Sequence, residues 1–303
     1  MGVTVDRSDR LSPGVRIGHW TAPSGASGCT VILPPPGNVS SYDLRGTSPG
    51  SREVATLDPD RQRTEVHGIL FTGGSAFGLA AADGVMRWLE EHDVGFKTPI
   101  ATIPIVPAAV IFDVGAGDRD SRPGPNAGYA ACEAATEEGV ATGRVGVGTA
   151  ATAGKWAGRE YFVPGGLGIA VARDGELAVH VLAVANPFGD VIAEDGSVLA
   201  GTTSPDPAMR PPPTEPRVAW NTVLVAVTTV ATLGRGDVRF LAARASDGIT
   251  QAVRPAHTRY DGDIAFAVTI PPDGDGPGVG ELDRLAVLAS SATSAAIRAA
   301  VAP

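Results

Sequence analysis

The spacing of hydrophobic residues along the chain predicts strands and helices in a mixed order. In the first half, apolar runs that begin near Cys29, Val66 and Ala108 predict strands. Apolar residues at helical spacing predict helices over 75–95 and 126–139, each closed by a glycine. The second of these helices begins with an asparagine, which is a favourable N-cap. This half therefore predicts strand–turn–helix units.

The second half predicts hairpins followed by helices. Residues 165–189 form two apolar runs joined by Asp-Gly, a dipeptide that favours a tight hairpin turn. After a proline-dense loop over 202–216, an unbroken β-branched segment starts at Val218 or Thr222. The remaining elements are a helix over 237–254 with Phe240, Leu241, Ala245 and Ile249 facing inward, a strand over 257–270 and a helix over 281–301. This mixture favours a layered α/β sandwich.

Composition and charge exclude several classes of partner. The chain has 303 residues, 43% of them hydrophobic, enough to bury a large core in one domain or two closely packed ones. Its net charge is −9 and lysine and arginine do not cluster, so we expect no nucleic-acid partner. The N-terminal segment is charged and lacks an apolar region, and no window reaches the ~18 apolar residues of a membrane span. We therefore expect a cytoplasmic protein without membrane contact.

One junction in the sequence suggests a nucleophile. The proline-dense segment stops at Asn221, and Thr222 opens the β-branched run. A threonine hydroxyl becomes a good nucleophile when its own free α-amino group serves as base, and an internal threonine gains that amine only if the preceding bond is cut. The loop offers a disposable segment before such a cut, and the strand would hold the new terminus rigidly. An ordinary loop-to-strand junction explains the same pattern.

Two further residues are candidates for stabilising negative charge. Asn186 lies between an apolar strand and a proline, where its amide can point at a developing oxyanion. Of the 24 basic residues only Lys97 and Lys155 are lysines, and Lys155 lies among small residues that would let its amine enter a dry cleft. The alternatives are a turn-forming asparagine and a solvated lysine.

A pair of carboxylates lies near the end of the chain. Asp261 and Asp263 are separated by one glycine, so in a regular strand both would point to one face and the pKa of one would rise. A carboxylate pair near an α-amino group can orient its ammonium or relay a proton. The alternative is a plain turn before a strand.

The glycine, histidine and cysteine residues indicate no cofactor. Gly73 and Gly74 form a turn between a predicted strand and helix, but their spacing fits neither the dinucleotide nor the Walker motif. We expect a close-packed or pocket-lining turn there. The five histidines and two cysteines lack metal-ligand spacing, so we expect no metal, and Cys29 and Cys132 suit buried thiols.

Several motifs occur in an order that resembles one protein family. The segments are PGVRIGHW, GILFTGGSAFGLAAADGV, GTAATAGKW, AVANPFG, NTVLVAV and HTRYDGDIAFAV. Together they resemble the DmpA-like self-processing aminopeptidases, which include β-peptidyl aminopeptidases, and are most similar to the nylon oligomer hydrolase branch. The resemblance implies a four-layer αββα sandwich of the N-terminal nucleophile type. It also implies a single domain, 1–303, that cuts itself into chains 1–221 and 222–303.

The resemblance also implies roles for the candidate residues. Thr222 would be the nucleophile, Lys155 and Asn186 would stabilise the oxyanion or position the nucleophile, and the carboxylates of Asp261 and Asp263 would organise the amine. Where this chain has Phe112, the nylon hydrolase branch has tyrosine, so a hydrogen-bonding group at the substrate is missing here. Phe112, Gly73 and Gly74 are the expected substrate-binding residues.

The resemblance implies a small peptide or amide substrate, such as a β- or ω-amino-acid oligomer, and a homo-oligomer of cleaved protomers. Two rival functions stay open. One is an acyltransferase that uses the same acyl-threonine, as in the similar ornithine acetyltransferases. The other is a member of the fold that binds ligands or acts as a scaffold without catalysis.

Overall fold

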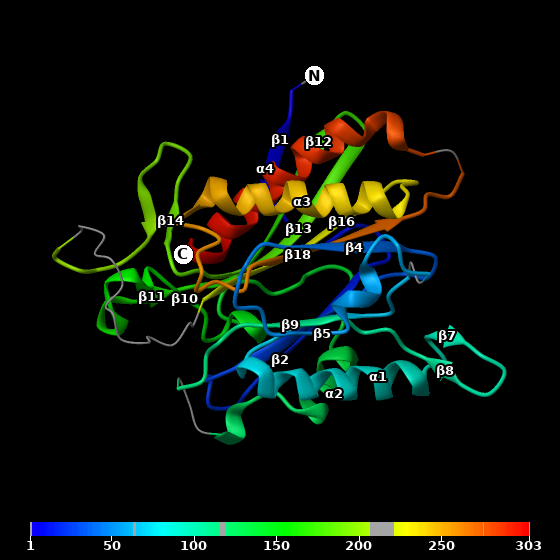
Figure 1. Cartoon of the computed structure of the whole chain (residues 1–303), viewed down its shortest axis with the longest axis horizontal. Helices are drawn as coiled ribbons and strands as arrows, with labels where there is room; N and C mark the ends of the chain where they lie inside the picture. The colour runs from blue at the N-terminus through cyan, green and yellow to red at the C-terminus, as the bar shows by residue number, and fades with distance from the viewer. Residues whose placement is uncertain (1, 63–64, 116–118, 207–220, 275, 303) are drawn as a thin grey trace.

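Four layers of secondary structure make up the molecule (Figure 1). The computed structural model describes residues 2–62, 65–115, 119–206, 221–274 and 276–302. Helices α3 (Arg235–Ala252) and α4 (Leu282–Val301) cover one side of a six-stranded sheet, and a five-stranded sheet packs on its other side. Helices α1 (Ala81–Glu91) and α2 (Pro125–Glu133) cover the outer face of the second sheet. The predicted αββα sandwich is confirmed.

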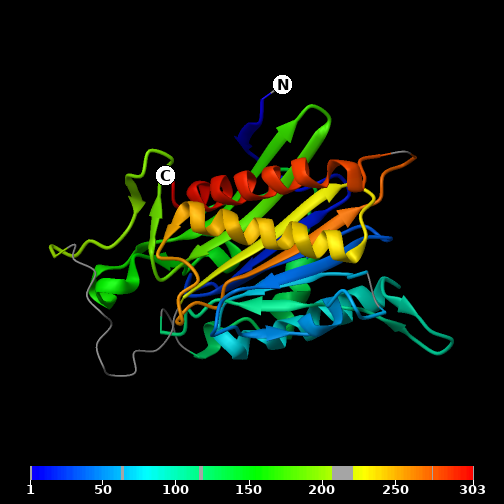
Figure 2. The same ribbon diagram turned by 45° about the horizontal axis from the view of Figure 1, so that its top comes forward.

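The larger sheet carries the residues around the Asn221–Thr222 junction. Its order is β1 (Thr4–Arg7), β12 (Gly166–Asp174), β13 (Leu177–Asn186), β16 (Thr222–Val230), β18 (Ile264–Ile270) and β4 (Val39–Leu44). Only β16 and β18 pair in parallel in this sheet, and the other neighbours are antiparallel. As predicted, β12 and β13 form a hairpin around an Asp-Gly turn. Figure 2 shows both helices lying across these strands.

The smaller sheet has the order β2 (Arg16–Thr21), β3 (Gly28–Leu33), β6 (Ile69–Thr72), β9 (Ala108–Val110) and β5 (Ser51–Arg52). Short pairs project from the sandwich. They are β7 (Phe96–Lys97) with β8 (Thr102–Ile103), β10 (Thr152–Ala153) with β11 (Val163–Pro164), and β14 (Asp190–Ile192) between β15 (Val198–Ala200) and β17 (Val253–Arg254).

Alternation along the central strands explains why the layers form. On β16, Val223 and Val225 face the helices, whereas Leu224 and Ala226 face the second sheet. Both faces are apolar, because this strand is covered on both sides. Phe71 of β6 meets Phe266 of β18 across the interface between the sheets, with ring centroids 5.9 Å apart. Burial of this surface rigidly fixes β16, which begins at Thr222.

Three expectations about the helices need correction. The helix expected over 126–139 runs only over Pro125–Glu133, and its N-cap is Gly124 rather than Asn126, because Pro125 already opens the first turn. The helix expected from residue 75 begins as a 3-10 turn, Ser75–Ala80, before α1. On α3, Phe240 is 38% exposed and lies under the Arg244 guanidinium, while the other three predicted inward residues are buried.

The start of β18 and the state of the two cysteines can be compared with the expectations. The strand expected over 257–270 starts only at Ile264, so Asp261 and Asp263 belong to the turn before it. Cys29 and Cys132 are both buried and free, as predicted. Val218 and most of the proline-dense loop lie outside the described residues. Among the described helices, none combines the length and apolarity that a membrane crossing needs.

Candidate active site

The antiparallel register of the central strands places Asn186 directly opposite Thr222. Asn186 is the last residue of β13, Thr222 is the first residue of β16, and the two are paired in the ladder. Both side chains are almost completely buried. The ladder therefore brings two predicted site residues, 36 positions apart in the sequence, to one end of the sheet.

The peptide bond between Asn221 and Thr222 is tightly held. The Thr222 hydroxyl donates a hydrogen bond to the carbonyl oxygen of Asn221, with an O···O distance of 2.5 Å. The same carbonyl accepts the backbone N–H of Gly262 at 3.0 Å. Asn221 also forms an isolated parallel bridge with Asp261. A hydroxyl group and a backbone N–H donor thus meet at one carbonyl oxygen, an arrangement suited to acyl transfer.

A crowded backbone explains the glycine at position 262. A Cβ atom there would lie 2.8 Å from the carbonyl oxygen of Ser48 and 3.0 Å from the Thr222 hydroxyl oxygen. Only glycine lets this backbone approach both groups. In the sequence Gly262 is only the glycine between Asp261 and Asp263, and nothing there marks its N–H as part of the site.

Lys155 is a buried amine that holds Asn186. Its Nζ donates to the backbone oxygen of Asn186 at 3.0 Å and to Asn186 Oδ1 at 2.7 Å, and Oδ1 also accepts the N–H of Thr152. Burial lowers the pKa of Lys155 well below its usual value, although the charges of Asp261, Asp263 and Asp113 oppose this shift. Burial thus shifts Lys155 toward the neutral amine, the form that can accept a proton.

The two predicted carboxylates perform different structural tasks. Asp261 accepts the N–H of Phe188 at 3.1 Å through Oδ1, and the N–H and hydroxyl of Thr258 at 2.8 and 2.5 Å through Oδ2. Burial, followed by the charge of Asp263, raises the pKa of Asp261 to about 6. The expected rise is found, with burial as its larger cause.

Asp263 connects β16, the strand that begins at Thr222, to a histidine. Its Oδ1 accepts a hydrogen bond from the N–H of Val223 at 2.7 Å, and its Oδ2 lies 2.8 Å from Nδ1 of His257 in a second hydrogen bond. The carboxylate therefore fixes the residue that follows Thr222. His257 was not singled out by the sequence analysis, although it lies in the same HTRYDGD segment; its spacing fits no catalytic or metal motif.

A third buried carboxylate lies at the Gly73–Gly74 turn. Asp113 accepts the N–H of Gly74 at 2.6 Å and the hydroxyl of Ser27 at 2.7 Å. Burial raises the pKa of Asp113, and these hydrogen bonds oppose the shift. A Cβ on Gly73 would lie 2.1 Å from Asp113 Oδ2, and Gly74 has φ of +80°, so this is a close-packed turn, as expected. Asp113 was not among the predicted site residues. Its position directly after an apolar strand, like that of Asn186, is the signal that could have identified it.

The expected substrate-binding residues lie beside Asp113. Phe112 is a half-buried residue that precedes Asp113, and its part in substrate binding stays a prediction, as do those of Gly73 and Gly74. Among the residues that the structure describes, no group of three or more histidine, cysteine, aspartate or glutamate side chains is arranged to hold a metal ion.

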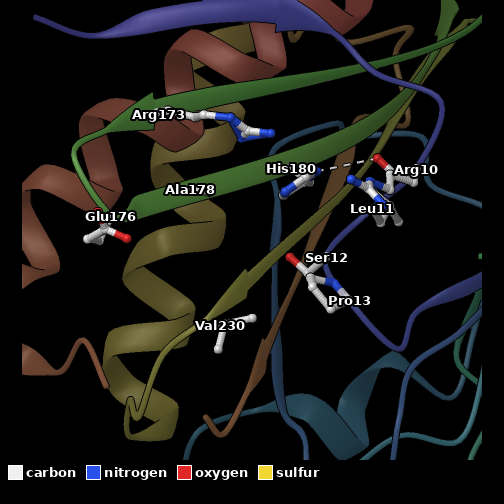
Figure 3. Close-up of a pocket in the computed structure, with 9 residues that line it drawn as sticks. All are labelled: Arg10, Leu11, Ser12, Pro13, Arg173, Glu176, Ala178, His180 and Val230. Atoms are coloured by element: carbon white, nitrogen blue, oxygen red, sulfur yellow. Dashed lines mark hydrogen bonds between the residues drawn. The ribbon is translucent and has the colours of Figure 1, made fainter. Parts of the chain in front are cut away.

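A separate cavity lies at the opposite end of β16 (Figure 3). It has a volume of about 320 Å³ and ends at Val230, the last residue of the strand that Thr222 begins. Its lining residues are Arg10, Leu11, Ser12, Pro13, Arg173, Glu176, Ala178, His180 and Val230. None of these belongs to the cluster around Thr222, so the cavity is not part of the candidate active site.

A protein-family model matches almost the whole length of the chain. The model of peptidase family S58 matches residues 12–302. The chain belongs to this family. An S58 peptidase hydrolyses peptide or other amide bonds, and the resemblance found in the sequence motifs is confirmed.

Curated relatives of this S58 peptidase carry related names. An uncharacterized aminopeptidase of Mycobacterium tuberculosis is 40% identical over 298 residues, covering 91% of this chain and 83% of the relative. A 6-aminohexanoate-oligomer endohydrolase of Agromyces is 31% identical over 274 residues, covering 85% of this chain and 73% of the relative.

Solved structures confirm the fold of this S58 peptidase. A Burkholderia β-aminopeptidase has a TM-score of 0.74 at 20% identity, with 99% of this chain and 88% of that chain covered. An L-aminopeptidase D-Ala-esterase/amidase from Ochrobactrum anthropi, described as a variant of the Ntn hydrolase fold, has a TM-score of 0.73 at 17% identity, with 99% and 87% covered. The chain therefore has the Ntn hydrolase fold.

Proposed function

We propose that this S58 peptidase cuts its own chain between Asn221 and Thr222 and then hydrolyses short peptides or amides through an acyl-enzyme on Thr222. The observation that carries this proposal is the carbonyl group of Asn221, which receives both the Thr222 hydroxyl and the Gly262 N–H. A plain loop-to-strand junction gives no reason for a nucleophile and an oxyanion donor to meet at one buried carbonyl.

Self-cleavage begins when the Thr222 hydroxyl oxygen adds to the carbonyl carbon of Asn221. The Gly262 N–H stabilises the negative oxygen, the hydroxyl proton passes to a base, and the C–N bond breaks as the nitrogen takes up a proton. The product is an ester between Asn221 and the Thr222 oxygen. Water hydrolyses this ester, which releases the Asn221 carboxylate and leaves Thr222 with a free α-amine.

Lys155 is the base for the first step, because Thr222 has no free amine before the cut. Its burial favours the neutral amine, and it is bonded to Asn186, the residue opposite Thr222. After the cut, the α-amine of Thr222 takes over as base, and Asp261 and Asp263 hold the segment around it.

Turnover of a substrate repeats the same chemistry at an external carbonyl. Thr222 attacks, the amine portion of the substrate leaves, and water hydrolyses the acyl-threonine ester. Once the carboxyl end of Asn221 moves away, the Gly262 N–H becomes available to the substrate carbonyl. The names of the relatives favour short peptides or ω-amino-acid oligomers as substrates, recognised near Phe112 and the Gly73–Gly74 turn. We expect the active form to be a homo-oligomer of cleaved protomers.

The mass of the purified protein tests this proposal. We expect two fragments on a denaturing gel, and mass spectrometry should show that the smaller one begins at Thr222. The Thr222→Ala variant should remain a single chain without amidase activity, while Thr228→Ala, a buried threonine farther along β16, should be cut normally. A wild-type protein that stays in one piece, or a light fragment with another first residue, contradicts the mechanism.

A further inference from the structure

His257 contacts hydrogen-bond acceptors through both of its ring nitrogens. Nδ1 lies 2.8 Å from Oδ2 of Asp263, and Nε2 lies 3.2 Å from the backbone oxygen of Ser246 in α3. A carboxylate and a carbonyl oxygen accept hydrogen bonds and cannot donate them. A neutral imidazole carries one proton, so it would turn a lone pair toward one of these oxygens. Both contacts are satisfied only by the doubly protonated ring.

The backbone supports a specific role for this residue. His257 has φ of +53°, in the left-handed region that residues other than glycine seldom adopt. Its backbone N–H donates to Asp263 Oδ2 at 3.2 Å, so one oxygen of the carboxylate accepts both the main chain and the ring of His257. The left-handed conformation places these two donors on the same acceptor.

We propose that the imidazolium of His257 is a positioning group that ties Asp263 to helix α3 and so fixes the strand that begins at Thr222. The connection runs from the Ser246 carbonyl through the ring to Asp263, and from Asp263 Oδ1 to the N–H of Val223. His257 acts on Thr222 only through Asp263. The role rests on the proposed function of Thr222.

The charges around His257 fit this role. Asp263 is the negative group in direct contact, and Asp261 lies close to Asp263. Arg45 is a positive group that acts on the ring, and it is itself paired with Asp43 and with Asp247 of α3. Lys155 is buried, and its burial favours the neutral form. The imidazolium is the cation in direct contact with the Asp263 carboxylate.

Burial disfavours the charged ring of His257, but the hydrogen bond and charge of Asp263 outweigh burial and raise its pKa. A histidine with a raised folded-state pKa contributes stability that is fully present below the unfolded value of 6.5 and is lost as the pH rises through the folded value. The positioning contact is therefore fully present below pH 6.5 and weakens as the pH rises through the folded-state pKa of His257.

The charge of His257 is measured by hydrogen–deuterium exchange at the imidazole Cε1, followed by mass spectrometry across a range of pH. The Thr222→Ala variant serves for this measurement, because the result then does not depend on self-cleavage. We expect the exchange midpoint of His257 to lie above 6.5, while those of His19 and His180, whose pKa values burial lowers to about 4, lie well below it. A midpoint at or below 6.5 for His257 overturns the proposal.

The functional role is measured with His257→Gln, which can still donate one hydrogen bond but cannot carry a charge. We expect self-cleavage and kcat to fall by up to about 100-fold, as for a misplaced reacting group, and the alkaline fall of the wild-type rate to disappear. His180→Gln, a buried histidine in the cavity of Figure 3, should keep the wild-type rate and profile.

The outcomes separate the two proposals. If His257→Gln keeps both the wild-type rate and its alkaline fall, the positioning role is wrong even though Thr222 acts as nucleophile. If the wild-type protein is not cut at Thr222, the proposed function fails, while the exchange midpoint still reports whether His257 is charged.

Discussion

Lys155 and Asn186 form a buried pair in which the lysine amine donates to the carboxamide oxygen of the asparagine at 2.7 Å. Because Asn186 lies opposite Thr222 in the ladder, this contact links the buried amine to the residue that begins β16. Removing the carboxamide with Asn186→Ala should slow self-cleavage by roughly 100- to 1000-fold, the usual cost of a lost oxyanion or positioning donor. The time course of precursor disappearance on a gel measures this.

Asn38→Ala is the matched control for that variant. Asn38 is equally buried, but its amide bonds Pro35 and Val66 just before β4, the edge strand of the larger sheet. It should lower Tm, with a loss of about 1–3 kcal/mol for the buried partners left unpaired, yet be cut at the wild-type rate. Equal cleavage of both variants would remove Asn186 from the chemistry.

The two lysines provide an internal comparison of a buried and an exposed amine. Lys155→Met and Lys155→Arg should each reduce self-cleavage by about 100-fold or more, because neither side chain can accept a proton at neutral pH. Lys97→Met, on the exposed β7–β8 hairpin, should leave the rate unchanged. A normally processed Lys155→Arg protein would show that a neutral amine is not required.

Gly262→Ala should block the site by crowding. The added methyl group would meet the Ser48 carbonyl and the Thr222 hydroxyl, so the N–H that binds the Asn221 carbonyl must shift. Gly236→Ala, near the start of α3 where a Cβ meets nothing within 4 Å, should cleave normally with an unchanged or higher Tm. Intact mass after purification distinguishes the two outcomes.

The ionisation of Asp261 should appear in the acid limb of the rate profile. Because its pKa is raised to about 6, Asp261 is protonated below that pH and loses the charge that we propose organises the amine. We expect kcat to rise with pH through about 6 and this limb to vanish in Asp261→Asn. Asp174→Asn, at a partly exposed carboxylate paired with Arg284, should retain the limb. An acid limb that persists in Asp261→Asn assigns it to another group.

Two histidines, the buried His180 and the partly buried His19, should make the fold sensitive to acid. Burial lowers the pKa of both His19 and His180 to about 4, below the unfolded value of 6.5. The unfolded chain therefore binds protons first as the pH falls from 6.5, and stability declines by up to about 1.4 kcal/mol per pH unit for each histidine until about pH 4. Thermal unfolding of His180→Gln should show a shallower fall of Tm over this window than the wild type.

Local pattern was enough for the layers but not for every boundary. The alternation on β12, β13 and β16 identified the hairpin and the central strand, since burial on both faces leaves an apolar run that is visible in sequence. Helix α2 begins at Pro125, because proline is favoured in a first turn. Strand β18 begins later than predicted, because Asp261 and Asp263 form other contacts before it. Phe240 was assigned to the wrong face, because a large apolar residue can lie on the surface beneath an arginine.

The sequence by itself determined the strand and helix order, the reactive residue types and the ordered motifs that mark the family. Only the tertiary structure decided which groups meet. The ladder set Asn186 against Thr222, the sandwich buried Lys155 and Asp113, and the turn before β18 joined His257 to Asp263. The physical reason is that hydrophobic periodicity is a local property of the chain. Distances between remote segments, and the burial that shifts a pKa, arise only when the layers pack together.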